Sequence, residues 1–210
     1  MESVLSIVFC LTLLYLAVTR RLESYVQMLA LQGMLLTAIN ILPLFGEFKP
    51  SYLLLPAILL VVKAFFIPMY LNKLIVESDL KRTIETTVQN FTFLLIMLAA
   101  MAVVFVTSRI LSESMPVDTI VFASGFSSVI CGLLIIMFRK KLIVHAIGFL
   151  ILENGIFLFG AAVHFELPFL VEIASLLDIF IVVFIMGVAL NKISSAAPET
   201  ETAELTRLGD

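Results

Sequence analysis

The stretch HAIGFLILENGIFLFG, residues 145–160, decides the fold because it is an apolar helix with a carboxylate in its middle. Glu153 and Asn154 lie side by side among leucine, isoleucine and phenylalanine. Placing a charged residue at the centre of a membrane-spanning helix costs about 2.5–3.5 kcal/mol on insertion scales. A residue with this cost is expected to face the interior of a helix bundle, where it has either a structural or a functional role.

The composition extends this interpretation to the whole chain. Of 210 residues, 61% are hydrophobic and only 14% are charged, whereas about a quarter of a soluble domain is charged. The chain is therefore predicted to be an all-α polytopic membrane protein. Cys10 and Cys131 lie in apolar runs without metal-ligand spacing, so no disulfide, iron–sulfur cluster or zinc site is expected. Neither a catalytic motif nor a nucleic-acid-binding patch is visible.

Seven apolar stretches have the roughly 20 residues that a helix needs to cross a bilayer. The predicted spans are 3–19, 25–43, 52–74, 90–108, 118–138, 142–163 and 168–190. The first span is expected to stay uncleaved, because its start is acidic and its arginines follow it. The polar run 77–90 is expected to form a short surface helix or the extended start of the fourth span.

Basic residues predict the orientation of these spans. Loops two, four and six contain only Lys49 and Arg109, and Lys63 lies within a span. This asymmetry places the N-terminus outside and the C-terminus in the cytoplasm. Residues 194–210 lack an apolar face and are expected to be a disordered cytoplasmic tail. The other loops and the tail contain ten basic residues, namely Arg20, Arg21, Lys73, Lys81, Arg82, Arg139, Lys140, Lys141, Lys192 and Arg207.

Three ionisable residues are predicted at one depth of the membrane. Glu153, Lys63 and Asp178 each follow the expected start of their span by about 10 or 11 residues, which is roughly 16 Å along a helix and close to the bilayer midplane. We therefore consider these three the candidate site. The candidate supporting polar residues are Asn154, Glu172, His145, Gln32 and Asn40.

Two interpretations of these residues remain open. In the structural one, they are polar contacts that hold helices together. In the functional one, they form a proton path, because burial raises the pKa of a carboxylate and lowers that of an amine towards neutrality. Pro56 and Pro68 flank Lys63 and are expected to kink its helix or to set its packing. The glycines beside Glu153, which are Gly148, Gly155 and Gly160, are expected to allow close helix approach.

Three segments also carry a resemblance to a known family. IGFLILENGIFL (147–158) and LVEIASLLDIFIVVFIMGVAL (170–190) look like the second and third helices of the small subunit K of respiratory complex I. With the IG pair and Asn154 aligned, the glutamate of subunit K falls at Leu150, one turn before Glu153. In length, seven-span layout and order of charges, the whole chain resembles the hydrogenase 4 component E family. VKAFFIPMYL (62–71) resembles the lysine helix of antiporter-like complex I subunits.

This resemblance implies a domain organisation and a role. Residues 1–110 would form a four-helix membrane part and residues 111–193 a three-helix part like subunit K. The chain would be a non-catalytic subunit, without a cofactor of its own, of an energy-converting nickel–iron hydrogenase or formate hydrogenlyase complex. Its partners would be antiporter-like and other membrane-arm subunits, a peripheral hydrogenase arm with iron–sulfur clusters, and the lipid of a prokaryotic cytoplasmic (inner) membrane.

Three hypotheses about function follow. In the first, Glu153, Asp178 and Lys63 relay protons, or sodium ions, between the electron-transfer arm and the antiporter-like subunits. In the second, the chain is a scaffold that bridges pumping modules without carrying protons. In the third, which the absence of an evident internal repeat disfavours, it is a stand-alone secondary transporter.

Overall fold

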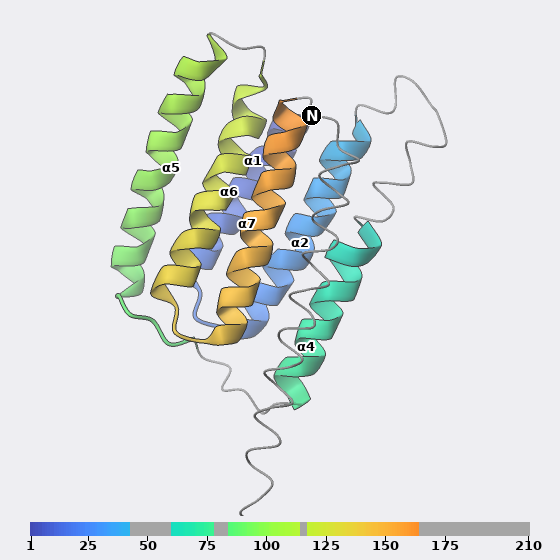
Figure 1. The fold of residues 1–210 in the computed structure, drawn as a ribbon, viewed down its shortest axis with the longest axis vertical. Helices are drawn as coiled ribbons and strands as arrows, with labels where there is room; N and C mark the ends of the chain where they lie inside the picture. The colour runs from blue at the N-terminus through green and yellow to red at the C-terminus, as the bar shows by residue number, and fades with distance from the viewer. Residues whose placement is uncertain (43–59, 78–83, 114–116, 164–210) are drawn as a thin grey trace, which may run out of the picture.

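The computed structural model describes residues 1–42, 60–77, 84–113 and 117–163, and every regular element in these ranges is a helix (Figure 1). The helices run roughly parallel or antiparallel to one another, with α5, α6 and α7 side by side and α2 and α4 beyond α7 (Figure 1). The elements are α1 (Glu2–Val18), α2 (Leu22–Ile41), the π-helix η3 (Leu60–Phe66), α4 (Ile67–Glu77), α5 (Asn90–Ser112), α6 (Thr119–Phe138) and α7 (Leu142–Ala162).

The lengths and apolar character of the helices identify a membrane-embedded protein. In the described part of the chain, α2, α5, α6 and α7 are each long and apolar enough to cross a bilayer. Helix α1 is also apolar but has only 17 residues. The all-α prediction is confirmed. The count of seven spans and the orientation stay predictions, because the seventh expected span, 168–190, and the tail lie outside the described residues.

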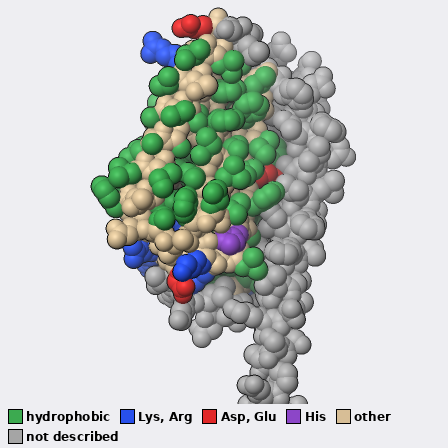
Figure 2. All heavy atoms as spheres, turned by 60° about the vertical axis from the view of Figure 1, so that its left-hand side comes forward, with side chains coloured by type: hydrophobic (Ala, Val, Ile, Leu, Met, Phe, Trp, Pro, Cys, Tyr) green, Lys and Arg blue, Asp and Glu red, His purple; other side chains and the backbone are tan. Residues whose placement is uncertain are grey.

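One outer face of the bundle shows what these helices present to their surroundings. Only 28% of the apolar window of α5 is buried, against 61% for α7. On the side of the bundle where α5 lies, the surface consists mostly of hydrophobic side chains (Figure 2). The hydroxyl of Thr107 donates to the carbonyl oxygen of Val103, so even this exposed polar group is satisfied within the helix. This face is suited to lipid. Its exposed members include Phe91, Leu95, Leu98, Val103, Val106 and Ile110.

Helices α6 and α7 pack with their backbones almost in contact, and glycines make this possible. A Cβ atom at Gly125 would lie 2.6 Å from the backbone nitrogen of Phe159, and one at Gly155 would lie 2.6 Å from the carbonyl oxygen of Gly125. A Cβ atom at Gly132 would collide with the carbonyl oxygen of Gly148. The prediction that Gly148 and Gly155 allow close helix approach is confirmed, and their partner is α6.

This packing determines which way Glu153 points. On α7, the residues that meet α6 are Gly148, Leu152, Gly155 and Phe159, at the spacing of one helix face. Glu153 follows this face by about 100° of helix rotation from Leu152. It is therefore turned away from the tight α6 contact and towards the α2 side of the bundle.

At one end of the bundle, residues 84–89 are hydrogen-bonded to the connection between α1 and α2 and to the connection between α6 and α7. The amide of Ile84 donates to the carbonyl oxygen of Arg20, and that of Thr87 donates to the carbonyl oxygen of Phe138. Thr86 forms an isolated antiparallel bridge with Arg139. The expectation of a helix is wrong for this stretch, because its backbone groups pair with neighbouring loops instead of with one another. Residues 78–83 lie outside the described part.

The side chain of Arg139, which the sequence analysis assigned to a loop, is buried at this same end. Its guanidinium donates to the carbonyl oxygens of Leu16 and Ala17 at 3.5 and 3.3 Å, and to Oδ1 of Asn90 at 3.3 Å. It also lies 4.6 Å from the ring centroid of Phe93. Arg139 therefore caps the last carbonyls of α1 and ties α6 to α1 and α5.

We expect Gly132→Ala to lower the stability of the bundle by about 1–3 kcal/mol, because α6 must move away from α7 to make room for the methyl group. Thermal unfolding in detergent, followed by circular dichroism, measures the change. The exposed neighbouring substitution Leu133→Met is the control and leaves the midpoint unchanged. An unaltered midpoint for Gly132→Ala contradicts the close helix contact.

We expect Arg139→Lys to destabilise the protein by about 1–3 kcal/mol, since a lysine cannot satisfy two carbonyl groups and an amide while stacking on an aromatic ring. The same unfolding measurement applies. Lys140→Ala, at the exposed adjacent position, is the matched control. Equal midpoints for the two variants rule out a capping role for Arg139.

Candidate functional site

The site begins with an irregular helix. Residues 60–66 form a π-helix that continues as α4, with Pro68 as the second residue of α4. A proline has no amide hydrogen and its ring crowds the carbonyl group four residues earlier, here that of Ala64. A wider turn relieves this crowding. Such π-helical turns are rare in proteins, and those that do occur are often at functional sites. The sequence left open whether the prolines kink the helix of Lys63 or only set its packing, and the structure has a π-helix at Lys63. Pro56 lies outside the described residues.

Lys63 and Glu153 form an ion pair in the interior of the bundle. The Nζ atom of Lys63 lies 3.1 Å from Oε2 of Glu153. Lys63 is 5% exposed and Glu153 is 2% exposed. The ammonium also lies 4.7 Å from the ring centroid of Phe157, one turn further along α7. Two oppositely charged groups from distant parts of the sequence are therefore paired away from water, and an aromatic face shields the cation.

Helix α2 holds the backbone of Lys63 from behind. A Cβ atom at Gly33 would lie 2.8 Å from the carbonyl carbon of Lys63 and 2.9 Å from the amide nitrogen of Ala64. Any larger residue at position 33 would push η3 away from α2. The approach permitted by Gly33 therefore sets the position from which Lys63 reaches Glu153.

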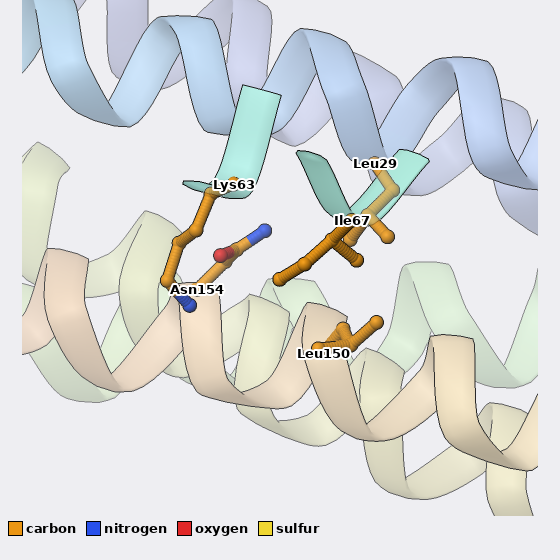
Figure 3. A pocket seen from close by; sticks show the side chains of 5 residues that line it. All are labelled: Leu29, Lys63, Ile67, Leu150 and Asn154. Carbon is orange, nitrogen blue, oxygen red and sulfur yellow. The ribbon is translucent and has the colours of Figure 1, made fainter. Parts of the chain in front are cut away.

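A small cavity adjoins the ion pair. Its lining residues come from α2, η3, α4 and α7, and the space open to the centre of a water-sized sphere is about 10 Å³. Figure 3 shows the amide of Asn154 rising from α7 between the side chains of Lys63 and Ile67. Leu150 lies on the same face of α7 as Asn154, one turn earlier. The cavity is lined by Leu29, Lys63, Ile67, Leu150 and Asn154.

The other predicted polar residues do not all join this centre. Gln32 is fully buried and donates to Oγ1 of Thr12 on α1 at 2.9 Å. Asn40 donates to the carbonyl oxygen of Leu36 in its own helix. The ring of His145 is hydrogen-bonded to the backbone oxygen of Arg139, at the end of the bundle where the loops meet. Asp178 and Glu172 lie outside the described residues.

Two residues of the site were not found by sequence reasoning. Gly33 and Phe157 lie in apolar runs that offer many similar residues, so composition does not distinguish them. Phe157 could have been found from its spacing, since it follows Glu153 by four residues and so shares its helix face. Gly33 could not, because its partner is the backbone of a distant segment.

This arrangement can hold a charge or a proton inside an apolar bundle. The carboxylate is stabilised as long as the ammonium stays near it, and each group becomes costly when separated from the other. Within the described ranges, no group of three or more His, Cys, Asp or Glu side chains is placed to bind a metal ion. The ion pair itself offers an acid and a base in contact with one another.

Comparison with known proteins gives one distant relative and no family. The chain is 26% identical over 193 residues to the uncharacterized protein Rv0085 of Mycobacterium tuberculosis, and the match covers 91% of this chain and 88% of the relative. No protein-family model matches the chain. No solved structure matches it. The match therefore extends over most of the length of both chains.

We expect Lys63→Met to destabilise the protein by about 3–5 kcal/mol, because it leaves a buried carboxylate without its ammonium partner. The double variant Lys63→Met/Glu153→Met removes both charges and is expected to be less destabilised than the single one. Thermal unfolding of the wild type, of Lys63→Met, of Glu153→Met and of the double variant forms a double-mutant cycle. Additive effects in this cycle would show that the two side chains do not interact.

Proposed function

We propose that this chain is a non-catalytic membrane subunit of a complex I-like energy-converting complex, linked to a hydrogenase, in the cytoplasmic membrane of a prokaryote. Its buried ion pair would form part of the proton relay between the electron-transfer arm and the antiporter-like subunits. The single observation that supports this proposal most is the 3.1 Å pair of Lys63 and Glu153 on a π-helix and a facing apolar helix.

The mechanism follows from the electrostatics of the pair. With the ammonium of Lys63 at its side, the carboxylate of Glu153 is stable without a proton. If Lys63 moves away, the carboxylate is left in an apolar surrounding and binds a proton instead. Return of Lys63 expels the proton towards the next acceptor, for which we propose Asp178 on the seventh predicted span. A small displacement of η3 would therefore load and unload Glu153.

The π-helix suits this displacement. A π-helix is rare and, where it occurs, is often at a functional site, and Pro68, the second residue after it, lacks an amide donor, so we propose that this segment can change its turn more readily than a regular α-helix. Lys63 lies in the middle of it. A change of turn there would move the ammonium relative to α7 without moving α2, against which Gly33 holds the backbone.

We expect Glu153→Gln to permit assembly of the complex and to abolish most of its proton pumping, because an amide of the same shape cannot take up and release a proton. Pumping by the reconstituted complex is measured as acidification of vesicles per electron transferred. Glu23→Gln, which alters a partly exposed carboxylate paired with Arg21, is the matched control and should pump normally. A Glu153→Gln complex that pumps at the wild-type rate overturns the relay.

A scaffold role is the second candidate, and the same ion pair favours it, since a buried pair also fixes the register of two helices. Under this alternative, Glu153→Gln reduces the yield of assembled complex, while the complexes that do assemble pump at the normal rate. Native gel electrophoresis of the solubilised membrane measures yield, and the vesicle assay on the same material measures pumping. The two functions therefore give opposite results.

A further inference from the structure

The cavity beside the ion pair contains a polar group whose hydrogen-bonding needs are unmet. Asn154 is 2% exposed, and its Nδ2 atom has no hydrogen-bond partner among the residues that the structure describes. Figure 3 shows this amide directed into the space between Lys63 and Ile67. Buried amide hydrogens in proteins almost always have a partner, which can be an ordered water. The cavity is where such a partner would be found.

We propose that this cavity binds one water molecule, whose oxygen accepts hydrogen bonds from Nδ2 of Asn154 and from Nζ of Lys63. The room open to a water-sized sphere, about 10 Å³, is near the minimum that one water needs. The remaining walls are the apolar side chains of Leu29, Ile67 and Leu150. They confine the molecule without offering further charged groups.

The chemistry of the lining selects water over an ion. Nζ of Lys63 and Nδ2 of Asn154 can only donate hydrogen bonds, so an occupant that meets both must accept them. The ammonium of Lys63 lines the cavity and would repel a metal cation placed there. A carboxylate already neutralises that ammonium 3.1 Å away, so little positive charge remains to attract an anion. A neutral molecule with an acceptor oxygen fits these conditions.

This water would extend the ion pair by one hydrogen-bonded position. It would link Lys63 to Asn154 and give a proton leaving the pair a place to move, along the face of α7 that also contains Leu150. That role rests on the proposed function. The binding of the water does not, because it follows from the geometry of the cavity and the unmet amide.

The experiment is a cryo-EM structure of the full-length chain, with all subunits that co-purify with it, at a resolution that shows buried waters. We expect a density peak within hydrogen-bond distance of Nδ2 of Asn154 and of Nζ of Lys63. A cavity that is empty in the wild-type map, while other buried waters are resolved, overturns the proposal. This measurement needs no variant, so it remains decisive if a substitution prevents folding.

Two variants test whether Asn154 holds the water. In Asn154→Leu, which replaces the amide with an apolar group of similar size, the peak should be lost. In Asn40→Leu, where the wild-type amide is paired within its own helix, the peak should persist. A peak that persists in Asn154→Leu contradicts the site as proposed.

The outcome is independent of the pumping assay. If the cavity is empty and the Glu153→Gln complex does not pump, the proposed water site is wrong and the proposed relay stands. If the cavity holds a water and the Glu153→Gln complex pumps normally, the proposed relay is wrong and the proposed water site stands.

Discussion

The need to keep one ion pair out of lipid and water governs the middle of this bundle. Lys63 and Glu153 come from helices that are otherwise apolar, and neither charge is tolerable alone at that depth. Their 3.1 Å contact, the ring of Phe157 beside the ammonium and the close approach of α2 at Gly33 all depend on one another. A shift of any one of these elements would weaken the pairing of the two charges.

The two faces of α7 have different roles in holding the ion pair. One face carries glycines that bring its backbone against α6, which fixes the helix in place. The other carries Glu153, Asn154 and Phe157 and meets the segment around Lys63. The rigid contact thereby serves as a support for the polar one. Opposite α7, the segment that bears the lysine is a π-helix rather than a regular α-helix.

A second buried cation, Arg139, has a different role. It lies at the end of the bundle and satisfies carbonyl groups of α1 together with an asparagine on α5. Its partners are neutral, whereas that of Lys63 is a carboxylate. An arginine that keeps its charge under all conditions is suited to holding loops together. Lys63 instead neutralises a buried carboxylate, and this contrast separates the cation that holds loops together from the cation of the candidate site.

The sequence by itself determined the all-helical membrane-embedded class, most helix bounds to within a few residues, and the burial of Lys63 and Glu153, because hydropathy and the cost of burying charge act locally along the chain. The glycines of α7 were recognisable for the same reason. The third ionisable candidate, Asp178, lies outside the described residues. Only the tertiary structure decided that Lys63 faces Glu153, that Gly33 backs the lysine, that Arg139 is buried, and that residues 84–89 pair with loops. Each of these depends on contact between segments far apart in sequence, and periodicity carries no information about which apolar face meets which.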